Sequence, residues 1–125
     1  MRPLKTSPLE TALLAVFHEL YGDQGFPLPG AIQVVCRKNT GGGRFVDLES
    51  VEHVRLDDGY VDLAGRYVKM SGLPNGLMAV ALIKNKRLQQ IELTVYGGDF
   101  WDGDEREWAI VSSNASNASN GPGSY

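Results

Sequence analysis

The order of local patterns constrains the fold of this chain most strongly: one capped amphipathic segment comes first, and only short β-type runs follow it. The motif Ser7-Pro8-Leu9-Glu10 combines an N-cap serine, a proline at the first helical position and the glutamate of a capping box. Gly22 follows, and a glycine can adopt the left-handed backbone conformation that commonly ends a helix. The sequence therefore predicts one helix over residues 8 to 20 or 21, whose apolar stripe is Leu9, Leu13, Val16, Phe17 and Leu20.

The rest of the chain is typical of an antiparallel meander. Residues 31–37 alternate like a half-buried strand, and later short apolar runs are separated by turn residues. The clearest pair is a hairpin of residues 77–83 and 88–96, in which a bulge near Gln89 and Gln90 brings the second strand into phase. A helix followed by strands indicates the α+β class. We expect one N-terminal helix packed on a twisted antiparallel sheet of about five to six strands.

The length and composition allow one core. With 125 residues, of which 42% are apolar, the chain has material for a single domain, expected over residues 1–111. Residues 112–125 are of low complexity and have almost nothing to bury, so they are predicted to form a disordered tail. Neither a signal peptide nor a run of about 20 apolar residues, the length of a membrane helix, is present. This pattern favours a cytoplasmic protein without membrane contact.

The side chains that serve catalysis and metal binding are few. His18 and His53 have no ligand spacing, and Cys36, the single cysteine, is flanked by apolar residues that predict an inert buried thiol. The carboxylates of residues 99–104 lack the alternation of a calcium loop. The glycines of residues 38–44 lead into a strand, which is typical of a hairpin tip and not of a phosphate loop. We expect no catalytic residue, no cofactor and no metal.

The densest chemical feature is the run DFWDGDERE at residues 99–107, with five carboxylates and two large aromatic rings. Rings in an acidic loop favour either burial in the chain's own core or a surface that a partner covers. Nucleic acid is not expected, because the short basic clusters at residues 37–44 and 84–87 lack the interleaved aromatics of a nucleic-acid surface. An acidic aromatic surface suits a basic protein partner. The predicted partner-binding residues are Asp99, Phe100, Trp101, Asp102, Asp104 and Glu105, with the rings as anchors and the carboxylates as steering or pairing charges.

An alternative function belongs to another class. A pocket between the helix and the sheet would make the chain a small-ligand binding module or an enzyme. Such a pocket is lined mainly by apolar side chains and needs few polar groups. Tyr60, Tyr67 and His53 are the candidates for those groups.

Two segments of the chain carry a resemblance to known proteins. Arg2-Pro3-Leu4 precedes the single amphipathic helix, and the C-terminal hairpin ends in IELTVYGGDFW at residues 91–101. In these features the chain resembles small immunity-protein-like bacterial proteins associated with toxin loci. The resemblance implies a cytosolic α+β domain without a cofactor, which binds and blocks a cognate toxin domain.

Overall fold

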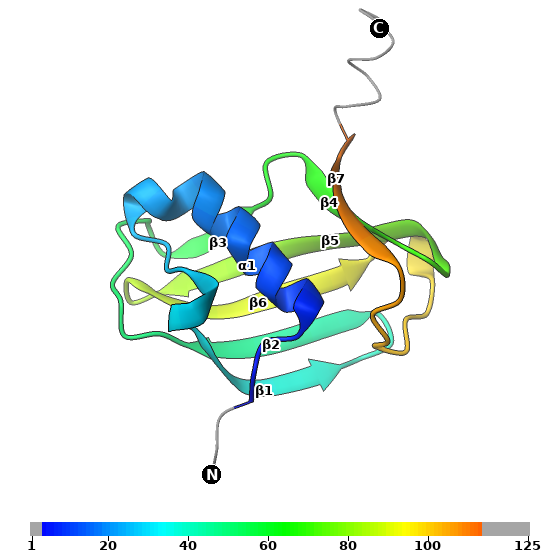
Figure 1. Cartoon of the computed structure of the whole chain (residues 1–125), viewed down its shortest axis with the longest axis horizontal. Helices are drawn as coiled ribbons and strands as arrows, with labels where there is room; N and C mark the ends of the chain where they lie inside the picture. The colour runs from blue at the N-terminus through cyan, green and yellow to red at the C-terminus, as the bar shows by residue number, and fades with distance from the viewer. Residues whose placement is uncertain (1–3, 114–125) are drawn as a thin grey trace, which may run out of the picture.

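One helix lies across one face of an antiparallel sheet in the computed structural model, which describes residues 4–113 (Figure 1). The α+β prediction is confirmed. The elements are the helix α1 (Pro8–Tyr21), the short 3-10 turns η1 (Gly22–Gln24), η2 (Pro29–Ala31) and η3 (Tyr96–Gly98), and the strands β1 (Gln33–Asn39), β2 (Gly43–Glu49), β3 (Gly59–Asp62), β4 (Arg66–Met70), β5 (Leu73–Lys84), β6 (Arg87–Val95) and β7 (Trp108–Ser112).

The seven strands form one sheet in the order β1-β2-β6-β5-β4-β7, and β3 also pairs with β5. Strand β5 is long enough to hold two neighbours on the same edge, β4 near its start and β3 near its end. Strand β3 is the element that the sequence did not predict, because its four residues GYVD are too short to show alternation. The sheet therefore has one strand more than the upper expectation.

Helix α1 begins as predicted. The Ser7 side chain accepts from the backbone N–H of Glu10, and the Glu10 carboxylate accepts from the backbone N–H of Ser7. Leu9, Leu13 and Phe17 are fully buried against the sheet. The predicted left-handed end at Gly22 is wrong, because this residue is right-handed (φ −63°) and the chain continues into η1. The left-handed residue is Gly25, at φ 91°.

Two bulges set which side chains the sheet buries. In the β5–β6 hairpin the register moves from Leu82 opposite Gln90 to Ile83 opposite Leu88, so Gln89 is the extra residue and the predicted bulge is confirmed. A second bulge follows Val34 in β1 and was not predicted. It places Cys36 opposite Asp47, where the thiol is exposed. The expectation of a buried thiol is therefore wrong.

Both ends of the described region form backbone hydrogen bonds with the sheet or with the turns that join its strands. Leu4 exchanges two backbone hydrogen bonds with Val34, at 3.1 and 3.3 Å, along the outer edge of β1. At the other end Ser112 closes β7, and the backbone N–H of Ser113 donates to Gly65 at 2.8 Å. Residues 112 and 113, which the prediction assigned to the tail, are therefore hydrogen-bonded to the sheet or its turns, and the rest of the predicted tail, from residue 114 on, lies outside the described residues. No helix in residues 4–113 is long and apolar enough to span a membrane.

Candidate functional site

The acidic aromatic loop of residues 99–107 has an inward half and an outward half. Trp101 is only 2% exposed, whereas the ring of Phe100 beside it is 74% exposed. A buried ring cannot contact a partner, so the prediction of Trp101 as a partner anchor is wrong. The role of Phe100 as an anchor remains a prediction.

Trp101 is a structural residue of the core. Its indole Nε1–H donates to the backbone carbonyl of Asp104 at 2.8 Å, and its backbone N–H donates to Gly41 at 2.9 Å. The Arg44 guanidinium lies over the ring, 4.7 Å from its centre, in a cation–π arrangement. These contacts bind the loop to the turn between β1 and β2.

A cluster of four charged side chains, of which Glu10 and Arg44 are buried and Arg37 and Glu105 are half-buried, joins the loop to the helix and the sheet. Arg44 donates to Glu10 at 3.0 Å and to Glu105 at 2.6 Å, while Arg37 donates to Glu10 at 2.6 Å. Glu105 also accepts from the backbone N–H of Leu9 at 3.0 Å, in the first turn of α1. Only 13% of the Glu105 side chain is exposed and its carboxylate is already paired with Arg44, so the prediction that it steers or pairs with a partner is wrong.

The charges of this cluster compensate one another. Burial alone would raise the pKa of Glu10, but the hydrogen bonds from Arg37 and Ser7 and the charges of Arg37 and Arg44 hold that pKa below its usual value. The folded protein therefore favours the ionised form of the Glu10 carboxylate. A buried charge that lost its partner here would be strongly destabilising. Nothing in the sequence pattern indicated the cluster, because its members come from distant segments.

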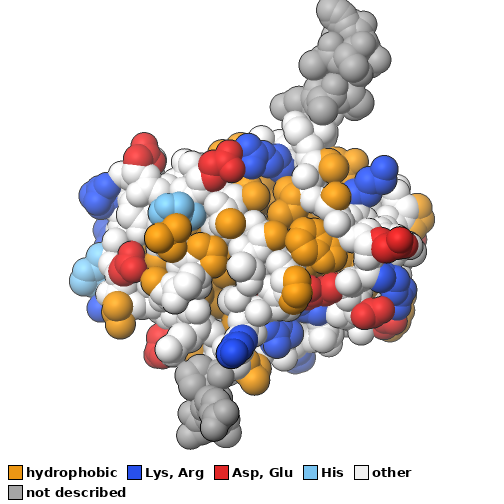
Figure 2. Space-filling view, in the orientation of Figure 1, with side chains coloured by type: hydrophobic (Ala, Val, Ile, Leu, Met, Phe, Trp, Pro, Cys, Tyr) orange, Lys and Arg blue, Asp and Glu red, His pale blue; other side chains and the backbone are white. Residues whose placement is uncertain are grey.

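The outward half of the loop also contacts other parts of the fold. The Phe100 ring packs over Gly41, where an added Cβ would lie 2.9 Å from the ring. Asp99 accepts from the Asn75 side-chain amide at 3.4 Å. Figure 2 shows acidic and basic side chains gathered at this end of the molecule. We call Asp99, Phe100, Asp102 and Asp104 the Phe100 surface.

Two carboxylates of the Phe100 surface share one cation. Arg106 contacts Asp102 at 2.6 Å and Asp104 at 3.0 Å. The backbone N–H of Asp104 donates to Asp102, and this bond, together with Arg106, lowers the pKa of Asp102. The carboxylate is therefore ionised at neutral pH. Three carboxylates and one guanidinium leave the surface with a net negative charge.

The polar groups predicted for a small-ligand pocket do not converge. Tyr67 lines a cavity of about 380 Å³ with Tyr96 and Met78, whereas His53 lines a different one of about 530 Å³. Tyr60 lines neither of these cavities and is 60% exposed. Neither of these two cavities therefore brings the three residues together.

Within residues 4–113, no group of three or more His, Cys, Asp or Glu side chains is arranged to hold a metal ion. Comparisons of the chain with protein-family models, with curated proteins and with solved structures find no match. The function must therefore be argued from the surfaces of the molecule.

Proposed function

We propose that this chain is a non-catalytic, cytoplasmic protein-binding domain that neutralises a cognate bacterial toxin by binding it through the Phe100 surface. The observation that carries the proposal is the 74% exposure of Phe100 on a loop whose other half is buried. Phe100 is the most exposed aromatic ring among residues 4–113, and an aromatic side chain seated in a partner's pocket is a common binding anchor.

Rigidity supports an anchor role for Phe100. The neighbouring Trp101 is fixed by Asp104, Gly41 and Arg44, so the chain on one side of the exposed ring does not have to be ordered when a partner binds. Little of the free energy of binding is therefore lost in ordering this part of the loop. A single preorganised ring that enters a partner's pocket can dominate the affinity of an interface.

The charge of the Phe100 surface supports a basic partner. Asp99, Asp102 and Asp104 belong to the same loop as Phe100, and Arg106 compensates only part of their charge. Negative charge beside an aromatic anchor accelerates encounter with a positively charged surface and disfavours acidic proteins. The choice of a toxin as that partner rests on the resemblance to immunity-protein-like proteins.

A direct test compares two exposed phenylalanines. We expect Phe100→Ala to abolish binding to the toxin-like product of a neighbouring gene, measured by calorimetry, and to abolish the rescue of growth when both are co-expressed. Phe45→Ala is the matched control, because Phe45 is 41% exposed on strand β2 and its side chain alternates with the buried Arg44 and Val46, on the other face of the strand. Equal binding by the two variants would place the interface elsewhere.

A further inference from the structure

The sheet has a gap along one edge of strand β5. Strands β3 and β4 both pair with this edge, but the pairing of β3 ends at Val80 and that of β4 ends at Leu77. Met78 and Ala79 therefore have no partner in either strand. The cavity of about 380 Å³ lies at this gap, because Met78 and Ala79 belong to its lining. We call it the Tyr67 cavity.

Two side chains of the cavity lie on the sheet face that the helix leaves uncovered. Met78 alternates along β5 with Leu77 and Ala79, which are buried in the core, so Met78 points to the opposite face. Tyr67 precedes the buried Val68 on β4 and therefore points to that face as well. Both side chains are half-buried. The cavity thus opens away from the helix.

The two tyrosines of the cavity come from opposite sides of β5. Tyr67 is on β4, Tyr96 follows the last residue of β6, and β5 lies between these strands. The Tyr67 ring packs on Gly76, where an added Cβ would lie 3.0 Å from the ring. Asn75, another lining residue, packs on Gly97 directly after Tyr96. These contacts give the walls of the cavity a defined position.

The hydroxyl groups of the two cavity tyrosines have no partner within residues 4–113. The other tyrosines of this part of the chain use their hydroxyls inside the fold: Tyr21 donates to a backbone carbonyl at 2.9 Å, and Tyr60 forms a hydrogen bond with Glu92. The hydroxyls of Tyr67 and Tyr96 are therefore available to a ligand, and each can donate or accept a hydrogen bond.

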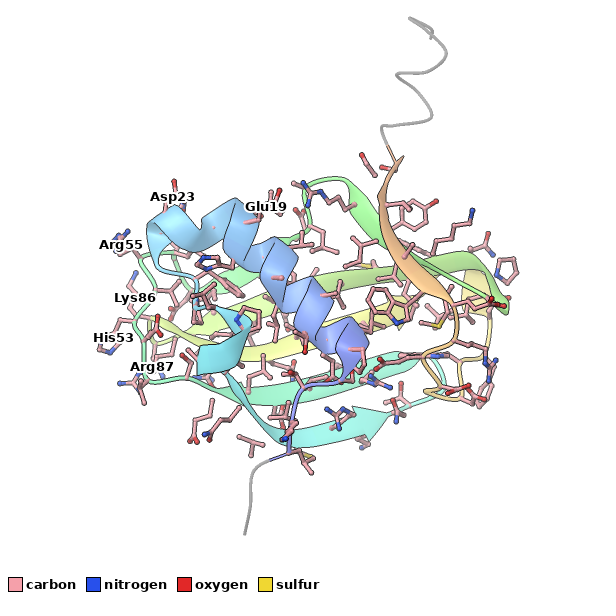
Figure 3. All side chains as sticks on the ribbon, viewed as in Figure 1. Glu19, Asp23, His53, Arg55, Lys86 and Arg87 are labelled. Atoms are coloured by element: carbon pink, nitrogen blue, oxygen red, sulfur yellow. The ribbon has the colours of Figure 1, made fainter. Side chains whose placement is uncertain are left out.

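The charged side chains of the cavity lining are already engaged. Asp62 accepts from the backbone N–H of Ala64 at 2.9 Å, and Arg66 pairs with Glu19 at 3.2 Å. Figure 3 shows Glu19 near the C-terminal end of helix α1. Asp62 and Arg66 are the two charged residues of the lining, and their charges are opposite. A charged ligand would therefore lose hydration without gaining a free counter-charge.

We propose that the Tyr67 cavity binds a small, uncharged aromatic molecule of one or two rings that carries a hydrogen-bonding group. The ligand ring packs against the two tyrosine rings and the Met78 sulfur, which are favourable contacts for an aromatic ring. Its polar group bonds to a tyrosine hydroxyl. A volume of about 380 Å³ is at the lower end of the range for ligand pockets and suits a molecule of this size. The inference does not rest on the proposed protein-binding function.

The test is a titration of the full chain with indole, followed by NMR shifts of backbone amides. We expect saturation with a dissociation constant of about 1 mM and the largest shifts at residues 65–67, 75–79 and 96. Tyr96→Ala removes one ring and should weaken binding about tenfold. Tyr67→Phe keeps the ring but removes its hydroxyl and should weaken binding about fivefold. Tyr60→Ala is the matched control, because Tyr60 lies opposite Leu82 on the same sheet face but outside the lining, and it should leave the affinity unchanged.

A second arm tests the class of the ligand on the wild type. Phenol should bind more tightly than cyclohexanol, which has the same ring size and hydroxyl without the aromatic ring, and more tightly than benzoate, which is charged. Thermal melts must show that Tyr96→Ala and Tyr67→Phe are folded; if neither is, the comparison of the three molecules decides. Shifts that never saturate, equal binding of phenol and cyclohexanol, tighter binding of benzoate, or wild-type affinity of a folded variant would overturn the proposal.

Discussion

The guanidinium carbon of Arg44 lies 4.7 Å from the centre of the Trp101 ring, and this contact joins the acidic loop to the core. The same guanidinium binds Glu10 at the start of the helix, Glu105, and the carbonyl of Gly103. One buried side chain thus connects helix, sheet and loop. The outward half of the loop can present Phe100 because the inward half is held in this way.

The first prediction concerns the two neighbouring rings of the loop. Trp101→Ala should lower the free energy of unfolding by about 3 to 5 kcal/mol, because it opens a large cavity beside Arg44. Phe100→Ala should change it by less than about 0.5 kcal/mol, because that ring is mostly in water. Urea melts followed by circular dichroism measure both values. Similar stabilities of the two variants would show that Trp101 does not pack as described.

The second prediction concerns acid stability. The pKa of Glu10 is lower in the folded chain than in the unfolded chain, so its ionised form stabilises the fold. This stabilisation is complete above the unfolded pKa, about 4.3, and is lost as the pH falls through the folded pKa. We expect Glu10→Gln to lower the unfolding free energy at pH 7 by about 3 to 5 kcal/mol. We also expect the variant to lose less stability than the wild type when the pH is lowered to 3.

The control for Glu10 is another glutamate of the same helix. Glu19 pairs with Arg66 at 3.2 Å, but 64% of its side chain is exposed. Glu19→Gln should therefore change stability at pH 7 by no more than about 1 kcal/mol. Urea melts at a series of pH values test both variants. If Glu10→Gln shows the same acid dependence as the wild type, the carboxylate does not contribute through its charge.

The third prediction concerns association with a basic partner. Asp102→Asn combined with Asp104→Asn removes negative charge from the Phe100 surface and should slow association severalfold, while Arg106→Gln should accelerate it. Both differences should shrink at high salt, because exposed charges are screened. Stopped-flow measurements at two ionic strengths test this. A slower association of Arg106→Gln would show that the partner surface is not basic.

The fourth prediction compares the cap of α1 with its buried face. Ser7→Ala removes the side-chain acceptor of the Glu10 backbone N–H and should destabilise the fold by about 1 kcal/mol. Leu13→Ala removes a fully buried side chain and should cost about 2 to 5 kcal/mol. Urea melts give the order of the two effects. A larger loss for Ser7→Ala would contradict the packing of the helix on the sheet.

Local patterns in the sequence predicted what is decided locally. The capping box needs only Ser7 and Glu10, three residues apart, and the bulge at Gln89 follows from the phase of Leu88 against Ile91. The helix, the long hairpin and the α+β class were predictable for this reason. The exposure of Cys36 was not predictable, because the sequence of residues 31–37 alternates regularly and gives no sign of the bulge after Val34.

The candidate site was predictable only in part. The sequence placed rings and carboxylates together in residues 99–107. The opposite orientations of Phe100 and Trp101, however, depend on Gly41 in the β1–β2 turn and on Arg44 at the start of β2, both distant in the sequence. The Glu105 side chain likewise meets Leu9, 96 positions away. Such contacts follow from the assembled sheet and helix. The proximity of His53 to Arg87 has the same origin, because their segments are far apart in the sequence and meet through the hydrogen bond from Val54 to Lys86 and the contact of Arg87 with His53.

The last prediction concerns the glycines of the β1–β2 turn, which the sequence indicated as a hairpin tip. At Gly43 an added Cβ would lie 1.9 Å from the backbone carbonyl oxygen of Leu93, on the neighbouring strand β6. At Gly42 an added Cβ would meet nothing within 4 Å. Gly43→Ala must therefore push β2 away from β6, and we expect it to destabilise the fold by about 2 kcal/mol or more.

Gly42→Ala is the matched control, since it adds the same methyl group one residue earlier in the turn. It should change the unfolding free energy by less than about 0.5 kcal/mol in urea melts. Because the backbone N–H of Val95 donates to Gly42 and that of Trp101 donates to Gly41, a displaced turn also disturbs the loop. Gly43→Ala should therefore shift the fluorescence of Trp101 to longer wavelength in a Trp108→Phe background. Unchanged fluorescence and stability would show that the two strands are not in close contact at Gly43.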